Sequence, residues 1–214
     1  MLSENNNRYW DRRAGVHDKK NAYGKNRIYA KCIDLIRQSI DKGCSVVDLG
    51  CGTGIVTYSL ADIAASITAI DSSEGMISMA RAKKRKGLHD HITFTMADMH
   101  YTGLPPQAAD VTLLCNVLHY SYSPQALLME AKRITKPNGL IIIFTNCYAS
   151  FRGINGFIAF TQGFLGRAFR LIPWVKLYSL RRLRNTLENS GMVIIAERKI
   201  SRRGILGLFT ILKT

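Results

Sequence analysis

A glycine-rich segment near residue 50 constrains this chain more than any other feature of the sequence. Residues 45–49 are apolar and β-branched apart from one aspartate, which is typical of a strand covered on both faces. Residues 50–54 then carry a glycine at every second position, which permits a sharp turn and a close approach of the backbone to a ligand. We expect Thr53 to cap a helix over residues 53–65. The segment therefore predicts a strand, a ligand-binding turn and a helix in succession.

The next predicted strand ends in a carboxylate. Residues 66–70 form an apolar, β-branched run, and Asp71 follows directly. A carboxylate at the tip of the second strand of such a unit is placed to accept hydrogen bonds from both hydroxyls of a ribose. The two segments together predict a site for a nucleoside-containing cofactor.

The order of the remaining patterns predicts an α/β fold. Strand-like runs alternate with helical patterns through the first two thirds of the chain, which is typical of a doubly wound, mostly parallel sheet. Late strands over residues 192–196 and 205–212 suit an antiparallel hairpin at the edge of a Rossmann-like sheet with seven strands in all. We expect one domain over 1–214, with an amino-terminal lid over about 1–25 and an insert over about 147–178. Further strands are predicted over 91–95, 110–115 and 140–144. Helices are predicted over 26–40, from residue 72 or 73 to a basic close at 83–87, over 124–134 and over 180–189.

Positive charge is concentrated in the carboxy-terminal part of the chain. Residues 1–130 hold 15 Lys and Arg against 13 Asp and Glu, a net of +2. Residues 131–214 hold the other 15 basic residues against Glu188 and Glu197, which accounts for +13 of the total of +15. Such asymmetry favours an anionic partner, either a phospholipid surface, nucleic acid or an acidic substrate. A solvated basic face is the alternative interpretation.

The cysteines and the amino terminus favour a cytoplasmic location. Five cysteines are scattered without paired spacing, which predicts reduced thiols and no metal site. The first residues lack the apolar core of a signal peptide, and no apolar run approaches the roughly 20 residues that span a bilayer. We therefore expect a cytoplasmic protein, with attachment to the inner face of a membrane as a further expectation.

Several motifs, in the right order, resemble those of the class I S-adenosylmethionine-dependent methyltransferases. The resemblance covers about residues 8–200, and the subgroup that the chain most resembles acts on small molecules and includes the quinone-biosynthesis methyltransferases. It implies S-adenosyl-L-methionine as the cofactor. The chain departs from the subgroup at His17-Asp18, where Tyr-Asp is usual, so a role given to that tyrosine does not carry over. The resemblance rests on Val-Val-Asp-Leu-Gly-Cys-Gly-Thr-Gly (46–54), Ala-Ile-Asp-Ser-Ser-Glu-Gly-Met-Ile (69–77), Ala-Asp-Met (97–99), Asp-Val-Thr-Leu-Leu-Cys-Asn-Val-Leu-His (110–119) and a turn at 132–141.

The resemblance also implies roles for particular residues around the cofactor. The turn at 50–54 would hold the methionine end, Asp71 the ribose, Met76 one face of the adenine, and Asp98 its amino group. The backbone near Cys115 would flank the methionine ammonium. The full predicted cofactor set is Asp48, Gly50, Cys51, Gly52, Thr53, Gly54, Asp71, Ser72, Met76, Ala97, Asp98, Met99, Cys115 and Asn116.

Methyl transfer is an in-line displacement, so the protein must mainly align the reacting atoms and exclude water. A general base is needed only when the acceptor is a hydroxyl or an acidic carbon. His119, just past the fourth predicted strand, and His17 are the candidates, with His100 and Tyr120 as further ones. The acceptor is expected to be small and apolar or lipid-like. The residues expected to cover it are Tyr9, Trp10, Phe157, Phe160 and Phe164.

Other functions are less compatible with the motifs. A nicotinamide-dependent dehydrogenase would place a glycine where this chain has Ile55. A base-amino methyltransferase of nucleic acids would carry an acidic or amide residue followed by Pro-Pro and an aromatic where this chain has residues 115–118. An RNA methyltransferase that uses the basic carboxy-terminal part stays an alternative, as does a non-catalytic, cofactor-binding interaction module.

Overall fold

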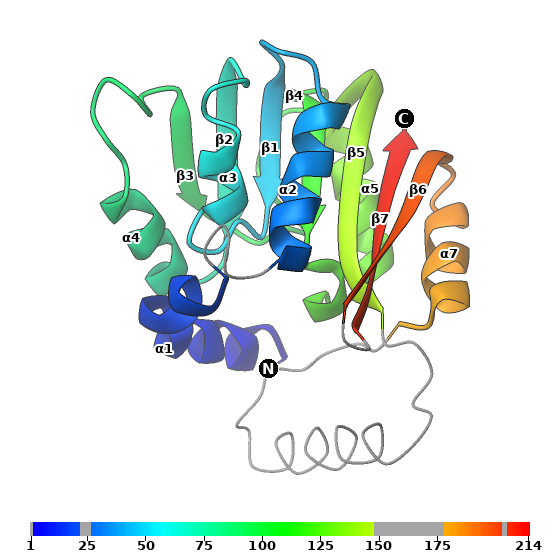
Figure 1. Cartoon of the computed structure of the whole chain (residues 1–214), viewed down its shortest axis with the longest axis horizontal. Helices are drawn as coiled ribbons and strands as arrows, with labels where there is room; N and C mark the ends of the chain where they lie inside the picture. The colour runs from blue at the N-terminus through cyan, green and yellow to red at the C-terminus, as the bar shows by residue number, and fades with distance from the viewer. Residues whose placement is uncertain (1, 22–26, 148–177, 203–204) are drawn as a thin grey trace.

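The computed structural model describes residues 2–21, 27–147, 178–202 and 205–214 (Figure 1). Most of the predicted insert, with Phe157, Phe160 and Phe164, lies outside the described residues. Among the helices that the structure describes, none is both long and apolar enough to cross a lipid bilayer.

The centre of the molecule is a seven-stranded sheet in the order β3-β2-β1-β4-β5-β7-β6. The first five strands run parallel, and β7 lies antiparallel between β5 and β6. This confirms the predicted doubly wound α/β fold with an antiparallel edge hairpin. The strands are β1 (Ser45–Leu49), β2 (Ser66–Asp71), β3 (Ile92–Met96), β4 (Ala109–Cys115), β5 (Thr135–Cys147), β6 (Val193–Arg202) and β7 (Ile205–Lys213).

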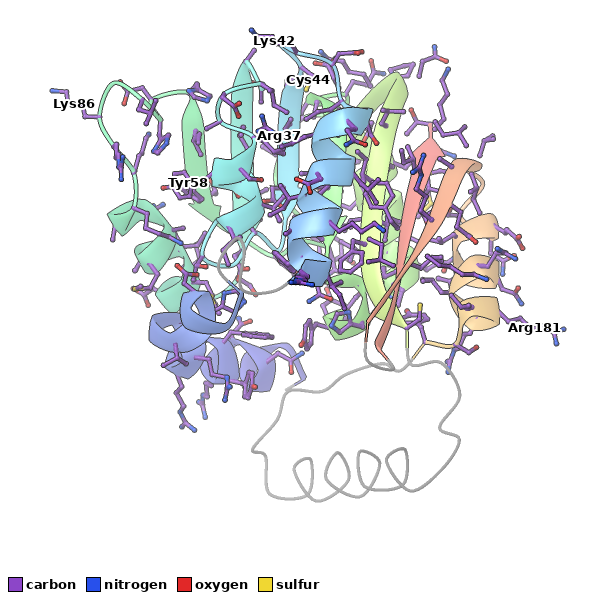
Figure 2. All side chains as sticks on the ribbon, in the orientation of Figure 1. Arg37, Lys42, Cys44, Tyr58, Lys86 and Arg181 are labelled. Atoms are coloured by element: carbon purple, nitrogen blue, oxygen red, sulfur yellow. The ribbon has the colours of Figure 1, made fainter. Side chains whose placement is uncertain are left out.

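Helices cover both faces of the sheet, because successive residues of the strands point to opposite faces and both sets are apolar. Val46 packs in one core with α2, α3 and α4, whereas Val47 packs in the other with α5 and α7. Arg37 of α2 pairs with Asp62 at 2.6 Å just after α3, on the face that also carries Tyr58 (Figure 2). The helices are α1 (Leu2–Asn21), α2 (Arg27–Ser39), α3 (Ile55–Ser59), α4 (Glu74–Ala82), the short 3₁₀ helix η1 (Leu118–Tyr120), α5 (Pro124–Ile134) and α7 (Leu180–Glu188).

The helix after the glycine-rich turn differs from the sequence prediction. It spans Ile55–Ser59 rather than residues 53–65, and its cap is Gly54, in the left-handed region at φ 78°, with no side-chain bond. The prediction that Thr53 caps this helix is wrong. A side-chain cap needs an extended backbone at the capping residue, and the Thr53 hydroxyl donates instead to Asp18 of α1.

The amino-terminal segment forms one continuous helix. It is a 20-residue helix, α1, that crosses below the carboxyl ends of the parallel strands, beside α4 (Figure 1). In an open parallel sheet, this is the edge where ligands bind. The helix therefore lies beside the edge of the sheet where a ligand is expected.

Candidate functional site

A cavity of about 620 Å³ lies between α1 and the carboxyl ends of the parallel strands. It brings together residues from α1, α2, the glycine-rich turn and the segments that follow β2, β3 and β4. Its lining residues are Asn6, Asn7, Tyr9, Trp10, Arg13, Val16, His17, Tyr29, Gly50, Cys51, Gly52, Asp71, Ser72, Met76, Met96, Ala97, Asp98, Met99, His100, Cys115, Asn116, Val117, Tyr120 and Tyr122.

The glycine-rich turn forms the floor of this cavity. The amide groups of Gly50 and Cys51 both donate to the carbonyl of Ile70, at 2.7 and 3.0 Å, which holds the turn against the end of β2. Gly50 has φ +71°, and a Cβ there would lie 2.4 Å from Cγ2 of Val117. Only glycine fits this position, so the close packing of the turn against Val117 depends on Gly50.

Asp71 presents its carboxylate at the cavity from the end of β2. Oδ2 accepts from the Gly52 amide at 2.8 Å, and Oδ1 accepts from the Ser73 amide at 2.9 Å. Burial raises the pKa of Asp71, and these two backbone bonds oppose the rise. Each carboxylate oxygen can accept more than one hydrogen bond, so the group retains capacity for hydroxyls of a ligand.

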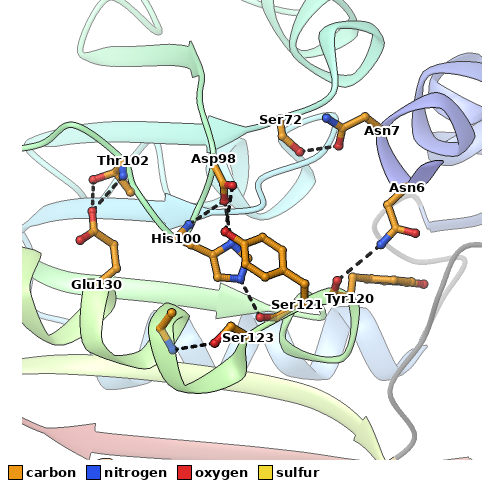
Figure 3. Close-up of polar contacts among 12 residues, drawn as sticks. Asn6, Asn7, Ser72, Asp98, His100, Thr102, Tyr120, Ser121, Ser123 and Glu130 are labelled. Carbon is orange, nitrogen blue, oxygen red and sulfur yellow. Dashed lines mark hydrogen bonds and ion pairs between the residues drawn. The ribbon is translucent and has the colours of Figure 1, made fainter. Parts of the chain in front are cut away.

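Asp98 lines the cavity from the segment after β3 and is held by a buried histidine (Figure 3). Oδ1 of Asp98 lies 2.6 Å from Nδ1 of His100 and accepts from the His100 amide at 2.9 Å. Nε2 of the same ring lies 2.7 Å from Oγ of Ser121. The ring of Tyr122 stacks on His100 at 3.8 Å, and its hydroxyl donates to Oδ2 of Asp98 at 3.3 Å. The orientation of Asp98 is therefore set by the β4–α5 connection.

One polar stripe of α1 docks the helix on α4. Asp11 accepts from the hydroxyl of Ser73 at 2.5 Å and from the amide of Gly75 at 3.1 Å. A Cβ on Gly75 would lie 3.0 Å from the backbone of Asp11, so the close approach of the two helices depends on this glycine. Oδ2 of Asp18 pairs with Lys83 at 2.7 Å at the other end of α4. The carboxylate of Asp11 also lies at the positive end of the α4 dipole.

A second stripe of α1 faces the cavity. Trp10, Arg13 and His17 recur at helical spacing and all line it. The Trp10 ring meets that of Tyr120 edge to face at 5.1 Å between centroids. The amide of Asn6 donates to the Tyr120 carbonyl at 3.5 Å (Figure 3). The helix thus joins the end of β4 to the glycine-rich turn across the cavity.

His17 is part of a hydrogen-bonded chain that ends at a carboxylate. The Thr53 hydroxyl donates to Asp18, so its oxygen is an acceptor toward Nδ1 of His17, 3.3 Å away. This arrangement favours the tautomer that carries its proton on Nδ1, which leaves Nε2 as a proton acceptor. Burial lowers the pKa of His17, and Asp18 partly offsets the effect. The ring is therefore neutral at neutral pH.

Most of the predicted site residues lie together, and a few do not. Thr53, Gly54, Asp48 and His119 are not among the residues that line the cavity. Asp48 is buried and accepts from the hydroxyl of Thr57 at 2.6 Å, and burial raises its pKa to about 6. His119 is buried, and Nδ1 of its ring has no hydrogen-bond partner among the described residues. The ring of His119 is thus not placed to take a proton from a ligand in the cavity.

Some lining residues were absent from the sequence predictions. Asn6, Asn7 and Arg13 were treated as part of a polar terminus, and Tyr29 as part of an ordinary helix. The signal that could have found Asn6 and Arg13 is the helical repeat of α1, in which positions 6, 10, 13 and 17 share a face. Tyr29 carries no such signal, since it reaches the cavity through the placement of α2.

The central part of the chain matches one family model. Residues 47–143 match the family described as methyltransferase domain. The matched part begins in β1 and ends in β5, so it contains the glycine-rich turn, Asp71 and Asp98.

Relatives with assigned names are methyltransferases. The chain is 28% identical over 133 residues to the malonyl-[acyl-carrier protein] O-methyltransferase of Serratia marcescens, which covers 56% of this chain and 50% of that protein. It is 27% identical over 146 residues to the ubiquinone biosynthesis O-methyltransferase of Xanthomonas oryzae, which covers 65% of this chain and 56% of the relative. The chain spans about half the length of these curated relatives.

Solved structures share the fold along nearly the whole chain. Geranyl diphosphate C-methyltransferase from Streptomyces coelicolor, solved with Mg²⁺, geranyl diphosphate and S-adenosyl-L-homocysteine, superposes with a TM-score of 0.75 at 13% identity, over 99% of this chain and 97% of that one. A methyltransferase from Aquifex aeolicus superposes with a TM-score of 0.66 at 17% identity, over 94% and 96% of the two chains. The resemblance to methyltransferases that the motifs predicted is confirmed.

Proposed function

The chain carries an S-adenosylmethionine-dependent methyltransferase domain, and we propose that it transfers the methyl group to a small, apolar or lipid-like acceptor. The observation that carries this proposal is the set of residues that line the cavity under α1. One part is lined by the glycine-rich turn, Asp71 and Asp98, and another by the rings of Trp10 and Tyr120. Such a cavity suits a polar nucleoside cofactor beside an apolar molecule.

The residues present fit the cofactor. The turn at residues 50–52 exposes backbone to the cavity because a side chain at Gly50 would collide with Val117. Asp71 would accept from the ribose hydroxyls and Asp98 from the adenine amino group, while Met76 would pack on the adenine ring. These three side chains reach one cavity from three different segments of the chain.

The protein contributes mainly position and exclusion of water. When bound, the cofactor supplies a methyl group on a positively charged sulfur, which is a good leaving group. The acceptor atom attacks in line with the bond that breaks, so its orientation decides the rate. Helix α1 covers the cavity and is tied down at both ends, by Asn6 at Tyr120 and by Asp18 at Lys83. The cover keeps water from the reacting atoms.

His17 is the residue that we propose as the general base for a hydroxyl acceptor. It lines the cavity, its ring is neutral at neutral pH, and Nε2 is free to take a proton if Nδ1 donates to Thr53. The proton lost by the acceptor hydroxyl would go to Nε2, and Asp18 would stabilise the resulting cation through Thr53 and directly, since Nδ1 of His17 lies 3.6 Å from Oδ1 of Asp18. His119 is not proposed for this role because it does not line the cavity.

The activity can be tested without knowing the acceptor. Purified protein is incubated with methyl-labelled S-adenosylmethionine and cell extract that has been split into lipid, small-molecule and RNA fractions. We expect label in the lipid or the small-molecule fraction with the wild type and none with Asp71→Ala. Label in the RNA fraction would favour the nucleic-acid alternative. Cofactor binding without label in any fraction would favour a non-catalytic binding module.

An anionic membrane surface is the partner that we propose for delivery of a lipid-like acceptor. The support is the excess of +13 in residues 131–214, part of which lies outside the described residues. Each cation near an anionic leaflet contributes about 1 kcal/mol, so attachment should be weak and sensitive to salt. Flotation with anionic and neutral vesicles, at low and high salt, tests this. Equal recovery with the two kinds of vesicle at low salt would contradict it.

A further inference from the structure

Arg13 is the one Lys or Arg among the residues that line the cavity in the described part of the chain. It extends from the stripe of α1 that also carries Trp10 and His17. Its guanidinium carbon lies 5.4 Å from the centroid of the Tyr9 ring, which is within range of a cation–π contact. The cation is therefore held against an aromatic ring that also lines the cavity.

The carboxylates around Arg13 are engaged by other groups. Asp11 accepts from Ser73 and Gly75, and Asp18 pairs with Lys83. Asp71 accepts from two backbone amides, and Asp98 from His100. Within the residues that the structure describes, Arg13 forms no ion pair. Its charge also contributes to the lowered pKa of His17, after the larger effect of burial, so the two side chains lie close together.

A partly buried guanidinium without a carboxylate partner favours an anion from outside the chain. Its planar fork matches the two oxygens of a carboxylate, and one positive charge balances one negative charge. A phosphate dianion would call for a second cation, which the lining residues do not supply. An uncharged ligand would leave the guanidinium desolvated without a charged partner, which is costly.

We propose that Arg13 is a carboxylate-binding residue of the cavity, with Tyr9 as the surface that holds its guanidinium in place. This inference rests on the proposed function, since it concerns the molecules that occupy the same site. The carboxylate has two sources, the methionine part of the cofactor and an acidic acceptor. A carboxylate from either source would lie near His17. Its negative charge would offset the repulsion between Arg13 and a protonated His17.

The chain offers a matched control for the test. Arg12 is the adjacent residue on α1, carries the same charge, is exposed and does not line the cavity. Arg13→Gln and Arg12→Gln therefore change the net charge equally. Arg13→Lys keeps the charge but loses the planar fork, and it serves as the second variant if Arg13→Gln melts below the wild type.

Two sets of calorimetric titrations measure ligand affinity for the wild type and for each variant. The first uses S-adenosyl-L-homocysteine, which carries the methionine carboxylate. The second uses decanoate and its uncharged counterpart decanol, in the presence of saturating S-adenosyl-L-homocysteine. We expect Arg13→Gln to weaken at least one carboxylate ligand by about 10-fold or more, because a charged hydrogen-bonded pair is lost. The affinities of Arg12→Gln for both carboxylate ligands should stay within about twofold of the wild type. The affinity of Arg13→Gln for decanol should also stay within about twofold of the wild type.

The two sets of titrations separate the sources of the carboxylate. If Arg13→Gln lowers the affinity for S-adenosyl-L-homocysteine, Arg13 binds the carboxylate of the cofactor. If it lowers only the affinity for decanoate, Arg13 binds the carboxylate of an acidic acceptor. The proposal is overturned if Arg13→Gln binds both S-adenosyl-L-homocysteine and decanoate with the affinities of the wild type. Failure of the wild type to bind S-adenosyl-L-homocysteine would instead contradict the proposed function.

Discussion

Asp98 and His100 are joined twice, through the His100 amide at 2.9 Å and through Nδ1 of the ring at 2.6 Å. The His100 ring is 2% exposed, and its far nitrogen lies 2.7 Å from Oγ of Ser121. A carboxylate at the cavity is thereby connected to a loop that follows a different strand (Figure 3). The orientation of the proposed adenine-binding group therefore depends on His100 and, through it, on Ser121.

We predict that His100→Phe weakens cofactor binding through Asp98. The substitution keeps a ring of similar size but removes both hydrogen bonds of the imidazole, so Asp98 is held only by the His100 amide and the Tyr122 hydroxyl. Loss of one well-oriented charged hydrogen bond should reduce affinity roughly 10-fold. Calorimetry with S-adenosyl-L-homocysteine and with 5′-methylthioadenosine, which lacks the amino-acid part, should give the same factor.

A double-mutant cycle tests whether His100 acts through Asp98. In an Asp98→Ala background, His100→Phe should have little further effect on affinity. Fully additive losses would contradict the positioning role and indicate a general disturbance of the fold.

The ribose assignment predicts a large effect at Asp71. A carboxylate that accepts two charge-assisted bonds should contribute about 2–3 kcal/mol, so Asp71→Ala should lower affinity for S-adenosyl-L-homocysteine by roughly 30-fold or more. Asp62→Ala is the control, because Asp62 pairs with Arg37 away from the cavity. Unchanged affinity in Asp71→Ala would refute the assignment, and tight binding of NADH by the wild type would refute the family of cofactor.

The position of α1 predicts that a ligand protects it from proteolysis. Trypsin cleavage after Arg12 and Arg13 requires the helix to open, and a ligand that binds only the closed form opposes this. At about ten times the dissociation constant of S-adenosyl-L-homocysteine, cleavage there should slow by about 10-fold. Cleavage at Arg181, which projects from α7 on the other side of the molecule, should not change (Figure 2). Equal rates at residues 12–13 with and without ligand would argue against a lid.

The burial of His119 predicts a loss of stability in mild acid. Burial lowers its pKa to about 4 from the ordinary value of 6.5. Between these values the unfolded chain binds a proton that the folded chain does not, so the free energy of unfolding falls as the pH falls from 6.5 toward 4. Between pH 7 and pH 5, protonation of His119 in the unfolded chain should lower the free energy of unfolding by about 2 kcal/mol. Urea unfolding of wild type and His119→Phe at the two pH values measures it, and an equal fall in both proteins would show that His119 is not responsible.

Local patterns were sufficient to predict the sheet and one half of the cavity. Apolar, β-branched runs separated by helical repeats are typical of a doubly wound, mostly parallel sheet, in which helices cover both faces of the strands. The glycines at 50–54 and the carboxylate after β2 are properties of neighbouring residues, and the end of each parallel strand falls at the same edge. The meeting of Gly52 with Asp71 at 2.8 Å follows from that geometry.

The other half of the cavity was decided by tertiary structure. The contacts of α1 join residues that are 35 to 114 positions apart, as between Thr53 and Asp18 and between Asn6 and Tyr120. No local pattern encodes such pairs, because a polar side chain that caps a helix and one that binds a distant carboxylate look the same in sequence. The same reason explains why Thr53 was predicted as a cap and His119 as a base. A hydroxyl or an imidazole takes its role from the partner that folding brings within about 3 Å, whereas a buried strand is specified by its own residues.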